Sequence, residues 1–321
     1  MYGISDLKPT LTITDSEVSC PVLNCQNTVQ RQRKSFTRKP EFHCEKHHIF
    51  ISPSTFEYDS SDANILWDYD DLNEHMASKR ESRIARDNSE DAVTWNVFCY
   101  LERQGLLIPY LSDLVKDAQI PLTQAKTIYW SHDKDTKQPW NPLLDARKEF
   151  EGDPSKGSEP DLIVLTDRIL FFIEAKLTAT NKTKPSHLNH PKHYLTGGDK
   201  WWDKAFAPGT DYVQIAEQEK KYELMRFWLL GTWMAKQLNV DFRLINLLRD
   251  ADDEERDIEA RFGKFLPDSS KAKFMRKTWE DICRFIQNQA PDSTDKDTML
   301  HYFREKSVGY RNGEIQRAFA V

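Results

Sequence analysis

The chain has 321 residues, of which 39% are hydrophobic and 30% are charged. This length allows one large domain, or a medium-sized domain with a small appendage, and the composition excludes a disordered or fibrous chain. The formal net charge of -6 argues against a protein that coats nucleic acid non-specifically, since such proteins carry a basic balance. It is compatible with an enzyme whose carboxylates repel phosphates until a cation neutralises them. Any attraction to phosphate must then come from local basic patches.

No targeting or membrane segment is expected. The first residues, MYGISDLKPTLTITD, lack a basic start followed by an apolar run and do not resemble a signal peptide. The most apolar stretch, from Phe227 to Ala235, has about half the length that a bilayer-spanning helix needs. We therefore expect a cytoplasmic protein with no membrane partner.

Three of the five cysteines lie in the first fifty residues, which favours a small metal-stapled module over residues 1–50. The candidate ligands are Cys20, Cys25, Cys44 and His47. Four such ligands suit tetrahedral Zn²⁺, and they leave no open position, so the zinc is expected to be structural. A core of about fifty residues is too small to be stable without a staple of this kind. The adjacent His43 and His48 are alternatives for the fourth ligand.

A basic segment without any acidic residue, QRQRKSFTRKP, lies between the two ligand pairs. Its cations are Arg31, Arg33, Lys34, Arg38 and Lys39. Positive charges grouped around an aromatic side chain, Phe36, on a metal-stapled hairpin can contact phosphate groups. We therefore expect this segment to bind nucleic acid.

Residues 51–87 are acidic and irregular, which indicates an extended connector with a solvated surface. Its aromatic residues Phe56, Tyr58 and Trp67 are expected to attach it to a main domain over residues 88–321. The acids of this segment are not expected to form a site.

The main domain alternates strands and helices, as in an α/β fold. Its first helix is expected to be capped by Asn88 or Ser89, with Glu90 in the first turn, where the helix dipole favours an acid. Further strands are expected over residues 121–130, 161–166, 169–176 and 240–248, a long helix over 211–238 and a late helix over 271–289. The two central strands are almost continuously apolar, which indicates burial on both faces. The predicted architecture is a mixed central sheet flanked by helices.

Ionisable groups gather at the adjoining ends of the two central strands. Asp161 begins the first strand, and Glu174 and Lys176 end the second, where residues two apart project from the same face. Burying these groups together is costly unless something pairs them. Two carboxylates form a hard oxygen site suited to Mg²⁺, which can activate water and neutralise charge on a phosphate. Lys176 is placed to orient or deprotonate that water, and a structural salt bridge is the alternative.

The stretch EPDLIVLTDRILFFIEAK resembles the motif of the PD-(D/E)xK, or restriction-endonuclease-like, nuclease superfamily. Pro160 and Asp161 match its first element, and Glu174, Ala175 and Lys176 match its second. The resemblance implies a restriction-endonuclease-like core. It also implies that Asp161, Glu174 and the carbonyl group of Ala175 bind the divalent metal.

Two further features of this superfamily have candidates in the chain. A helix glutamate before the first strand often joins the metal site, and Glu90 has that place, although the helix dipole also explains an acid there. A Gln-x3-Tyr helix behind the site marks the exonuclease branch. Gln218 and Tyr222 have this spacing, with Gln214 one turn earlier, although they also fit the polar edge of an amphipathic helix. The resemblance spans residues 89–248 and leaves out the N-terminal module.

The function that the resemblance implies is a Mg²⁺-dependent endonuclease acting on DNA, of the restriction or phage-defence type, with Mn²⁺ as an alternative ion. The same residues would equally serve RNA hydrolysis. Cutting both strands of a duplex needs two active sites, so a homodimer is expected, and other subunits of a defence or repair system are further candidate partners. The alternative function is a catalytically silent nucleic-acid-binding protein or adaptor that recognises DNA through the zinc module.

Overall fold

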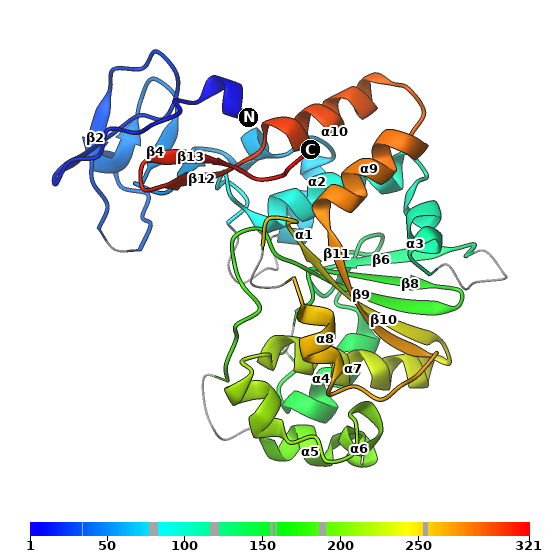
Figure 1. Cartoon of the computed structure of the whole chain (residues 1–321). Helices are drawn as coiled ribbons and strands as arrows, with labels where there is room; N and C mark the ends of the chain where they lie inside the picture. The colour runs from blue at the N-terminus through cyan, green and yellow to red at the C-terminus, as the bar shows by residue number, and fades with distance from the viewer. Residues whose placement is uncertain are drawn as a thin grey trace. The chain divides into compact units, whose positions relative to one another are not determined.

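A computed structural model gives the fold of the chain (Figure 1). It describes residues 1–33, 35–76, 83–115, 122–154, 157, 159–185, 191–252 and 256–321. The chain divides into two compact units. Unit 1 comprises Met1–Leu106, Arg249–Ala251 and Trp279–Val321, and unit 2 comprises Leu107–Leu248 and Asp252–Thr278. Within the described ranges, no helix combines the length and the apolar character that crossing a bilayer requires.

Unit 2 is built on a six-stranded mixed sheet with the strand order β11-β10-β9-β8-β6-β7. The strands are β6 (Ala125–Tyr129), β7 (His132–Asp133), β8 (Leu162–Thr166), β9 (Ile169–Ala175), β10 (Asp241–Leu248) and β11 (Ala272–Thr278). β10 runs parallel to both β9 and β11, whereas β8 runs antiparallel to both β6 and β9. The mixed central sheet expected from the sequence is confirmed.

The β8–β9 hairpin has the position and the two-residue turn that the sequence predicts. β-branched and aromatic side chains favour these strands, and every residue of β9 is buried. Thr166 Oγ1 accepts a hydrogen bond from the N–H of Ile169 at 2.9 Å and so closes the turn. The register pairs Leu162 with Ile173, which sets Asp161 beside the end of β9.

Helices cover one face of this sheet (Figure 1). They are α4 (Asn141–Glu151), α5 (Pro191–Lys200), α6 (Trp202–Ala205), η4 (Gln214–Gln218), α7 (Tyr222–Leu238) and α8 (Ile258–Gly263), and α3 (Leu107–Val115) also belongs to the unit. Apart from α3, these helices share one core with Ile163, Leu170 and Phe172 of the sheet through their apolar side chains. Gly231 lets α7 approach β10 closely, because a Cβ atom at this position would overlap the ring of Phe242.

The prediction of a single helix over residues 211–238 is wrong, because the helix is interrupted near its middle. η4 is a turn of π-helix that ends at Gln218, Lys220 takes a left-handed backbone conformation (φ 54°), and α7 starts at Tyr222. Sequence periodicity misses the break because the helix-favouring run QEKKYE contains neither Gly nor Pro. The break gives α7 a start of its own, independent of the preceding turn.

The prediction of one late helix over residues 271–289 is also wrong, because these residues form a strand followed by a helix. β11 takes the first half, and α9 (Trp279–Gln289) follows directly in the sequence. Ala272 and Phe274 pack against the core of unit 2, and Lys273 lies between them. Burial alternates only over these first three residues, and the many charges of KAKFMRKT hide the strand from a search for apolar periodicity.

Unit 1 begins with short elements that form an N-terminal core. They are η1 (Ile4–Asp6), β1 (Glu17–Ser19), β2 (Thr28–Gln30), η2 (Pro40–Phe42), β3 (His43–Cys44), β4 (Ile49–Ile51) and β5 (Phe56–Tyr58). β1 pairs with β2, and β3, β4 and β5 form a three-stranded antiparallel sheet. Phe56 and Tyr58 are buried in this core beside Tyr310. The segment expected to be a connector therefore starts as part of the folded N-terminal core.

The rest of unit 1 brings the two ends of the chain together. Its elements are η3 (Ser61–Asn64), α1 (Tyr69–Met76), α2 (Glu90–Arg103), α9, α10 (Thr294–Glu305), β12 (Ser307–Arg311) and β13 (Glu314–Arg317). Ser89 Oγ accepts a hydrogen bond from the N–H of Ala92 at 3.2 Å, so Ser89, one of the two predicted candidates, caps α2. The N–H of Leu11 donates to Gly313 O at 2.8 Å, so the C-terminal hairpin pairs with the N-terminal segment. The sequence predicted a module over residues 1–50 and a domain over residues 88–321. The two compact units have other bounds, because hydrogen bonds between residues far apart in the sequence join the two ends of the chain in unit 1.

A buried ion pair joins three segments of unit 1. Lys306 Nζ lies 3.4 Å from Asp87 Oδ1 and 3.1 Å from Asn64 Oδ1, and Ser307 Oγ donates a hydrogen bond to Asp87 Oδ2. The side chains of Lys306 and Asp87 are 1% and 0% exposed. Removing one partner of such a pair leaves the other charge buried and uncompensated, which costs about 3–5 kcal/mol.

Replacing Lys306 by Ala should lower the free energy of unfolding of unit 1 by about 3 kcal/mol, because Asp87 loses its only oppositely charged partner in the described part of the chain. Urea denaturation followed by tryptophan fluorescence measures this loss. Arg284→Ala is the control, since Arg284 and Asp281 form an exposed pair (64% and 39% exposed) that contributes at most about 1 kcal/mol. Equal losses in the two variants would contradict the prediction.

Candidate functional site

The acidic residues singled out in the sequence meet at one end of the β8–β9 hairpin. Asp161 directly precedes β8, Glu174 and Ala175 end β9, and Lys176 follows it. The Asp161 carboxylate accepts a hydrogen bond from the N–H of Ala175 at 2.8 Å. This contact fixes the first acid against the backbone between Glu174 and Lys176. The predicted convergence of these side chains is therefore present.

The Lys176 ammonium group bridges two carboxylates. Nζ donates one hydrogen bond to Glu174 Oε1 and another to Glu223 Oε2, the latter at 2.9 Å. Glu223 lies in the first turn of α7, where the helix dipole favours an acid, and its N–H donates to Thr183 Oγ1 at 2.9 Å. Glu223 was not among the predicted site residues, because a helix beginning at residue 211 would place it mid-helix.

Burial gives the cluster unusual electrostatics. Glu174 is 4% exposed and Lys176 is 7% exposed, whereas Asp161 and Glu223 are half-buried and open the cluster to solvent. Burial raises the pKa of Glu174 well above its usual value. The Lys176 ammonium group opposes this rise, and the charges of Asp161 and Glu223 add to it.

One oxygen of the cluster lacks a partner. Glu174 Oε2 is buried and accepts no hydrogen bond in the part of the chain that the structure describes. A buried acceptor left unsatisfied costs about 1–3 kcal/mol. The salt bridge between Lys176 and Glu174 Oε1 does not supply the partner that this oxygen lacks among the described residues.

Two buried asparagines support the end of β9. Asn246 of β10 pairs with Glu174 in the sheet register, and its Nδ2 lies 3.5 Å from the Glu174 carbonyl oxygen. The side chains of Asn246 and Asn181 exchange hydrogen bonds of 2.7 and 3.1 Å, and neither residue is more than 1% exposed. Such a satisfied buried pair holds the strand end in one position. The sequence signal for it is a polar residue inside the apolar strand INLL.

The remaining residues implied by the resemblance are distributed over other elements. Glu90 starts α2 in unit 1, whereas the acidic cluster belongs to unit 2, and its metal role stays a prediction. Gln218 is exposed at the end of η4, with Gln214 at its start, and Tyr222 begins α7 beyond the break. Tyr222 packs against the core, and its hydroxyl lies 3.0 Å from that of Tyr194. Gln218 and Tyr222 therefore do not share one helix, as the Gln-x3-Tyr pattern requires.

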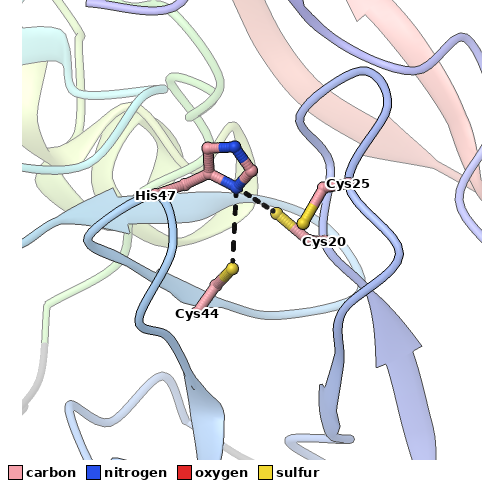
Figure 2. Close-up of side chains that lie close together, drawn as sticks. All are labelled: Cys20, Cys25, Cys44 and His47. Carbon is pink, nitrogen blue, oxygen red and sulfur yellow. Dashed lines mark hydrogen bonds between the residues drawn. The ribbon is translucent and has the colours of Figure 1, made fainter.

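A second candidate site lies in unit 1 and consists of three cysteines and one histidine (Figure 2). The ligand atoms of Cys20, Cys25, Cys44 and His47 all lie within 4.8 Å of one another. His47 Nδ1 is 3.4 Å from Cys20 Sγ and 3.6 Å from Cys44 Sγ. Three thiols and an imidazole in this arrangement can hold a tetrahedral metal ion such as Zn²⁺.

Two tight turns present these four side chains. The first turn lies between Cys20 and Cys25, where Asn24 takes a left-handed conformation (φ 60°) that its short polar side chain tolerates. In the second turn, the N–H of His47 donates to Cys44 O at 3.1 Å. Each turn brings two ligands together, and the short strands bring the two turns together.

His47 is the histidine that faces the thiols. Its pKa is lowered by burial and by nearby lysine charges, so the ring is neutral at neutral pH and can offer Nδ1 to a metal. His43 and His48 instead contact Asp59, at 2.8 and 3.5 Å. This geometry selects His47 among the three candidate histidines.

The basic segment between the ligand pairs is partly committed to the fold. Arg31 and Arg33 donate hydrogen bonds to the carbonyl oxygens of residues 14 and 15, at 2.9 and 2.6 Å. Lys39 is exposed, and Lys34 lies outside the described residues. Nucleic-acid binding by this segment stays a prediction.

The guanidinium group of Arg38 makes contacts within the N-terminal core. It donates to the carbonyl oxygen of Asp59, lies 3.6 Å from Glu57 Oε1, and its guanidinium carbon is 4.9 Å from the ring centre of Phe50. These contacts involve Nη2, Nε and one face of the group. Arg38, whose side chain is 44% exposed, is therefore partly committed to the fold, like Arg31 and Arg33.

No family model, curated protein or solved structure matches the chain. The chemistry assigned to the two clusters therefore rests on their residues, on the geometry of those residues, and on the resemblance carried by the short motif from Pro160 to Lys176.

Proposed function

We propose that this chain is a metal-dependent nuclease that hydrolyses phosphodiester bonds in DNA with the acidic cluster of unit 2. The observation that carries the proposal is the meeting of Asp161, Glu174 and Lys176 at the Ala175 peptide, with one buried Glu174 oxygen lacking a partner in the described structure. The mixed sheet is compatible with the restriction-endonuclease-like core that the sequence motif suggests.

Each residue of the cluster has a distinct role in this proposal. Asp161, Glu174 and the carbonyl group of Ala175 would hold Mg²⁺, or Mn²⁺ in its place. The bound ion would supply neutralising charge at the phosphate and a lower pKa for the attacking water. Lys176 would orient that water or hold a proton beside it, and Glu223 is a positioning residue, because its hydrogen bond fixes the amine of Lys176.

We further propose that Cys20, Cys25, Cys44 and His47 bind a structural Zn²⁺ ion. Four protein ligands fill a tetrahedral site and leave no position for a reacting water. The N-terminal strands are only two or three residues long, and strands this short need additional stabilisation to stay folded. A metal ion at their centre would provide it.

DNA as the substrate, endonucleolytic cutting and a role in phage defence are suggested by the resemblance to restriction enzymes. RNA offers the same phosphodiester bond, so both polymers should be tested. A duplex substrate would require two active sites, which a homodimer provides. Other subunits of a defence or repair system are further candidate partners.

Glu174→Gln and Asp161→Asn should abolish Mg²⁺-dependent nicking of supercoiled plasmid, because each removes a ligand of the ion. Lys176→Met should lower the rate by about 10²–10⁴-fold, the usual loss for a proton-transfer group. The matched control is Asp167→Asn, which removes an exposed acid from the turn of the same hairpin and should cut like the parent. EDTA should stop cleavage by the parent.

Variants that keep the parent's circular dichroism and melting temperature yet nick plasmid at the parental rate would refute the proposed active site. A parent protein that binds the plasmid with Mg²⁺ present but never cuts it would favour the alternative, a catalytically silent nucleic-acid-binding protein. Cleavage that appears only after a partner is added would favour an adaptor role.

Divalent-cation binding should tighten as the pH rises above the usual carboxyl range. Burial raises the pKa of Glu174, so at lower pH the folded protein holds a proton there that the cation must displace. Without a cation, the same raised pKa should make unit 2 less stable as the pH rises from the usual carboxyl pKa towards the raised one. Calorimetric titration with Mn²⁺ in buffers of different ionisation enthalpy should detect the released proton. Affinity that does not change with pH would contradict the prediction.

Protein purified without chelators should contain one zinc ion per chain by plasma mass spectrometry. Cys44→Ser should lose that zinc and lower the melting temperature, because one of four ligands is gone. Cys283→Ser changes a buried thiol outside the cluster and should keep the metal. A metal-free parent, or full zinc content in Cys44→Ser, would rule out the site.

A further inference from the structure

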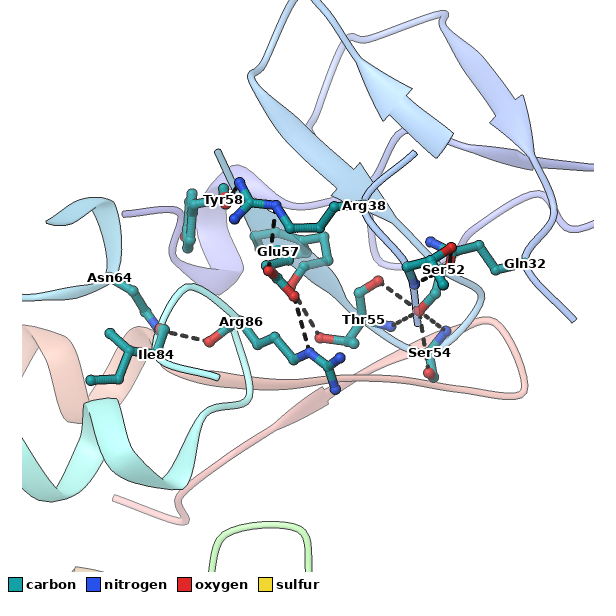
Figure 3. A network of polar contacts seen from close by, with 12 residues as sticks. Gln32, Arg38, Ser52, Ser54, Thr55, Glu57, Tyr58, Asn64, Ile84 and Arg86 are labelled. Atoms are coloured by element: carbon teal, nitrogen blue, oxygen red, sulfur yellow. Dashed lines mark hydrogen bonds and ion pairs between the residues drawn. The ribbon is translucent and has the colours of Figure 1, made fainter. Parts of the chain in front are cut away.

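Unit 1 contains a polar cavity of about 770 Å³ that none of the proposed metal sites uses. Separate segments of the chain line it, with residues 31–33, 36, 52–55, 86 and 88 among them. Figure 3 shows several of the side chains in this region, including Gln32, Ser54 and Arg86. We call it the arginine pocket and define it by Arg31, Arg33, Phe36, Ser54, Arg86 and Asn88.

In each arginine of the pocket, only some of the guanidinium N–H groups donate hydrogen bonds within the described structure. Arg31 Nη1 and Arg33 Nη2 each donate one hydrogen bond to a backbone carbonyl oxygen. Arg86 Nε donates to Glu57 Oε2 at 3.1 Å, and its guanidinium carbon lies 4.6 Å from the ring centre of Phe36. A guanidinium group carries five N–H donors, so each arginine keeps donors beyond those that hold it in place.

One N–H donor of Arg31 lacks a hydrogen-bond acceptor among the described residues. Its Nε is buried and has no hydrogen-bond partner in the described part of the chain. A buried donor on a cation is costly to leave unsatisfied. An oxyanion bound in the pocket would supply the acceptor.

The charge balance of this surface favours an anion. Asp15 is the only acid among the residues that line the pocket, beside the arginines Arg31, Arg33 and Arg86. Glu57 pairs with both Arg38 and Arg86, at 3.6 and 3.1 Å. Within the described ranges, no ion pair neutralises the positive charge of Arg31 and Arg33.

The walls of the pocket are fixed by hydrogen bonds. Gln32 is 6% exposed, and its amide donates to Ile51 O at 2.8 Å and accepts from the N–H of Thr37 at 2.7 Å. Ser52 Oγ accepts from the N–H of Thr55 at 3.1 Å and closes the turn that carries Ser54 (Figure 3). Donors held in place before binding lose little conformational freedom when a ligand arrives.

We propose that the arginine pocket binds a phosphate group of a nucleic-acid strand. Planar guanidinium forks match phosphate oxygens in pairs, which makes arginine the preferred side chain for such contacts. The cavity has the size of a small-ligand site, so it accommodates a phosphate with its sugar and base. A free nucleotide carries the same phosphate and is the other source of the ligand. The proposal does not depend on cleavage by unit 2.

The test is binding of a fluorescently labelled oligonucleotide to the full chain, measured by anisotropy without added divalent cation and without chelator. Arg31→Gln and Arg86→Gln should each weaken binding by roughly tenfold, the equivalent of about 1.4 kcal/mol and the low end for a charge-assisted hydrogen bond. Arg33→Gln replaces the exposed arginine, which contributes least to the fold, and should weaken binding without lowering the melting temperature. Each change should reduce the slope of log affinity against log salt by about 1.

Arg284→Gln is the matched control, because it removes one exposed positive charge from α9 of the same unit. Unlabelled mononucleotide is then added as a competitor. Displacement of the oligonucleotide would identify free nucleotides as a source of the ligand. Failure to displace it would show that the pocket requires a nucleic-acid strand. Both results support the pocket. Arginine-pocket variants that bind like the parent, or no more weakly than Arg284→Gln, would overturn it, whether or not the protein cuts DNA.

Discussion

The hydrogen bond from the Ala175 N–H to the Asp161 carboxylate is the contact on which the candidate active site depends. It exists because β8 and β9 are joined by a two-residue turn in a fixed register, with Leu162 opposite Ile173. A slip of one residue would turn Asp161 to the opposite face of the sheet. Burial of β9 on both faces resists such a slip, because every shift would misplace apolar side chains that are now in the core.

The cluster that this register creates is electrostatically incomplete on its own. Burial disfavours the charge of Glu174, and Lys176 only partly compensates for it. Glu223 joins from α7, and it does so because the chain breaks at Lys220 and restarts a helix whose first turn favours acids. The strand register and the start of α7 therefore bring Glu174, Lys176 and Glu223 into contact. A hard cation would stabilise the buried charge of Glu174.

The two candidate metal sites follow opposite physical rules. The acidic cluster offers hard oxygen donors and stays partly open through half-buried Asp161 and Glu223, as a reacting centre requires. The cysteine cluster offers soft donors, and its four ligands would surround an ion completely, as a structural metal site requires. Strands of the same N-terminal core lead into the arginine pocket, since Arg31 follows β2 and Ser52 follows β4, and these strands pair with β1 and β3 beside Cys20 and Cys44. In unit 1, metal binding and phosphate binding would thus depend on one small folded core.

Local chemistry in the sequence determined the β8–β9 hairpin, the Ser89 cap and the set of cysteines, because strand propensity, caps and ligand spacing act over a few residues. Tertiary structure alone decided the rest. It selected His47 over its neighbours, because Asp59 holds His43 and His48. It turned residues 272–278 into a strand by parallel pairing with β10, and it brought Glu223 to Lys176 from 47 residues away. Contacts between residues far apart in the chain depend on how elements pack, and neither propensity nor periodicity encodes that packing.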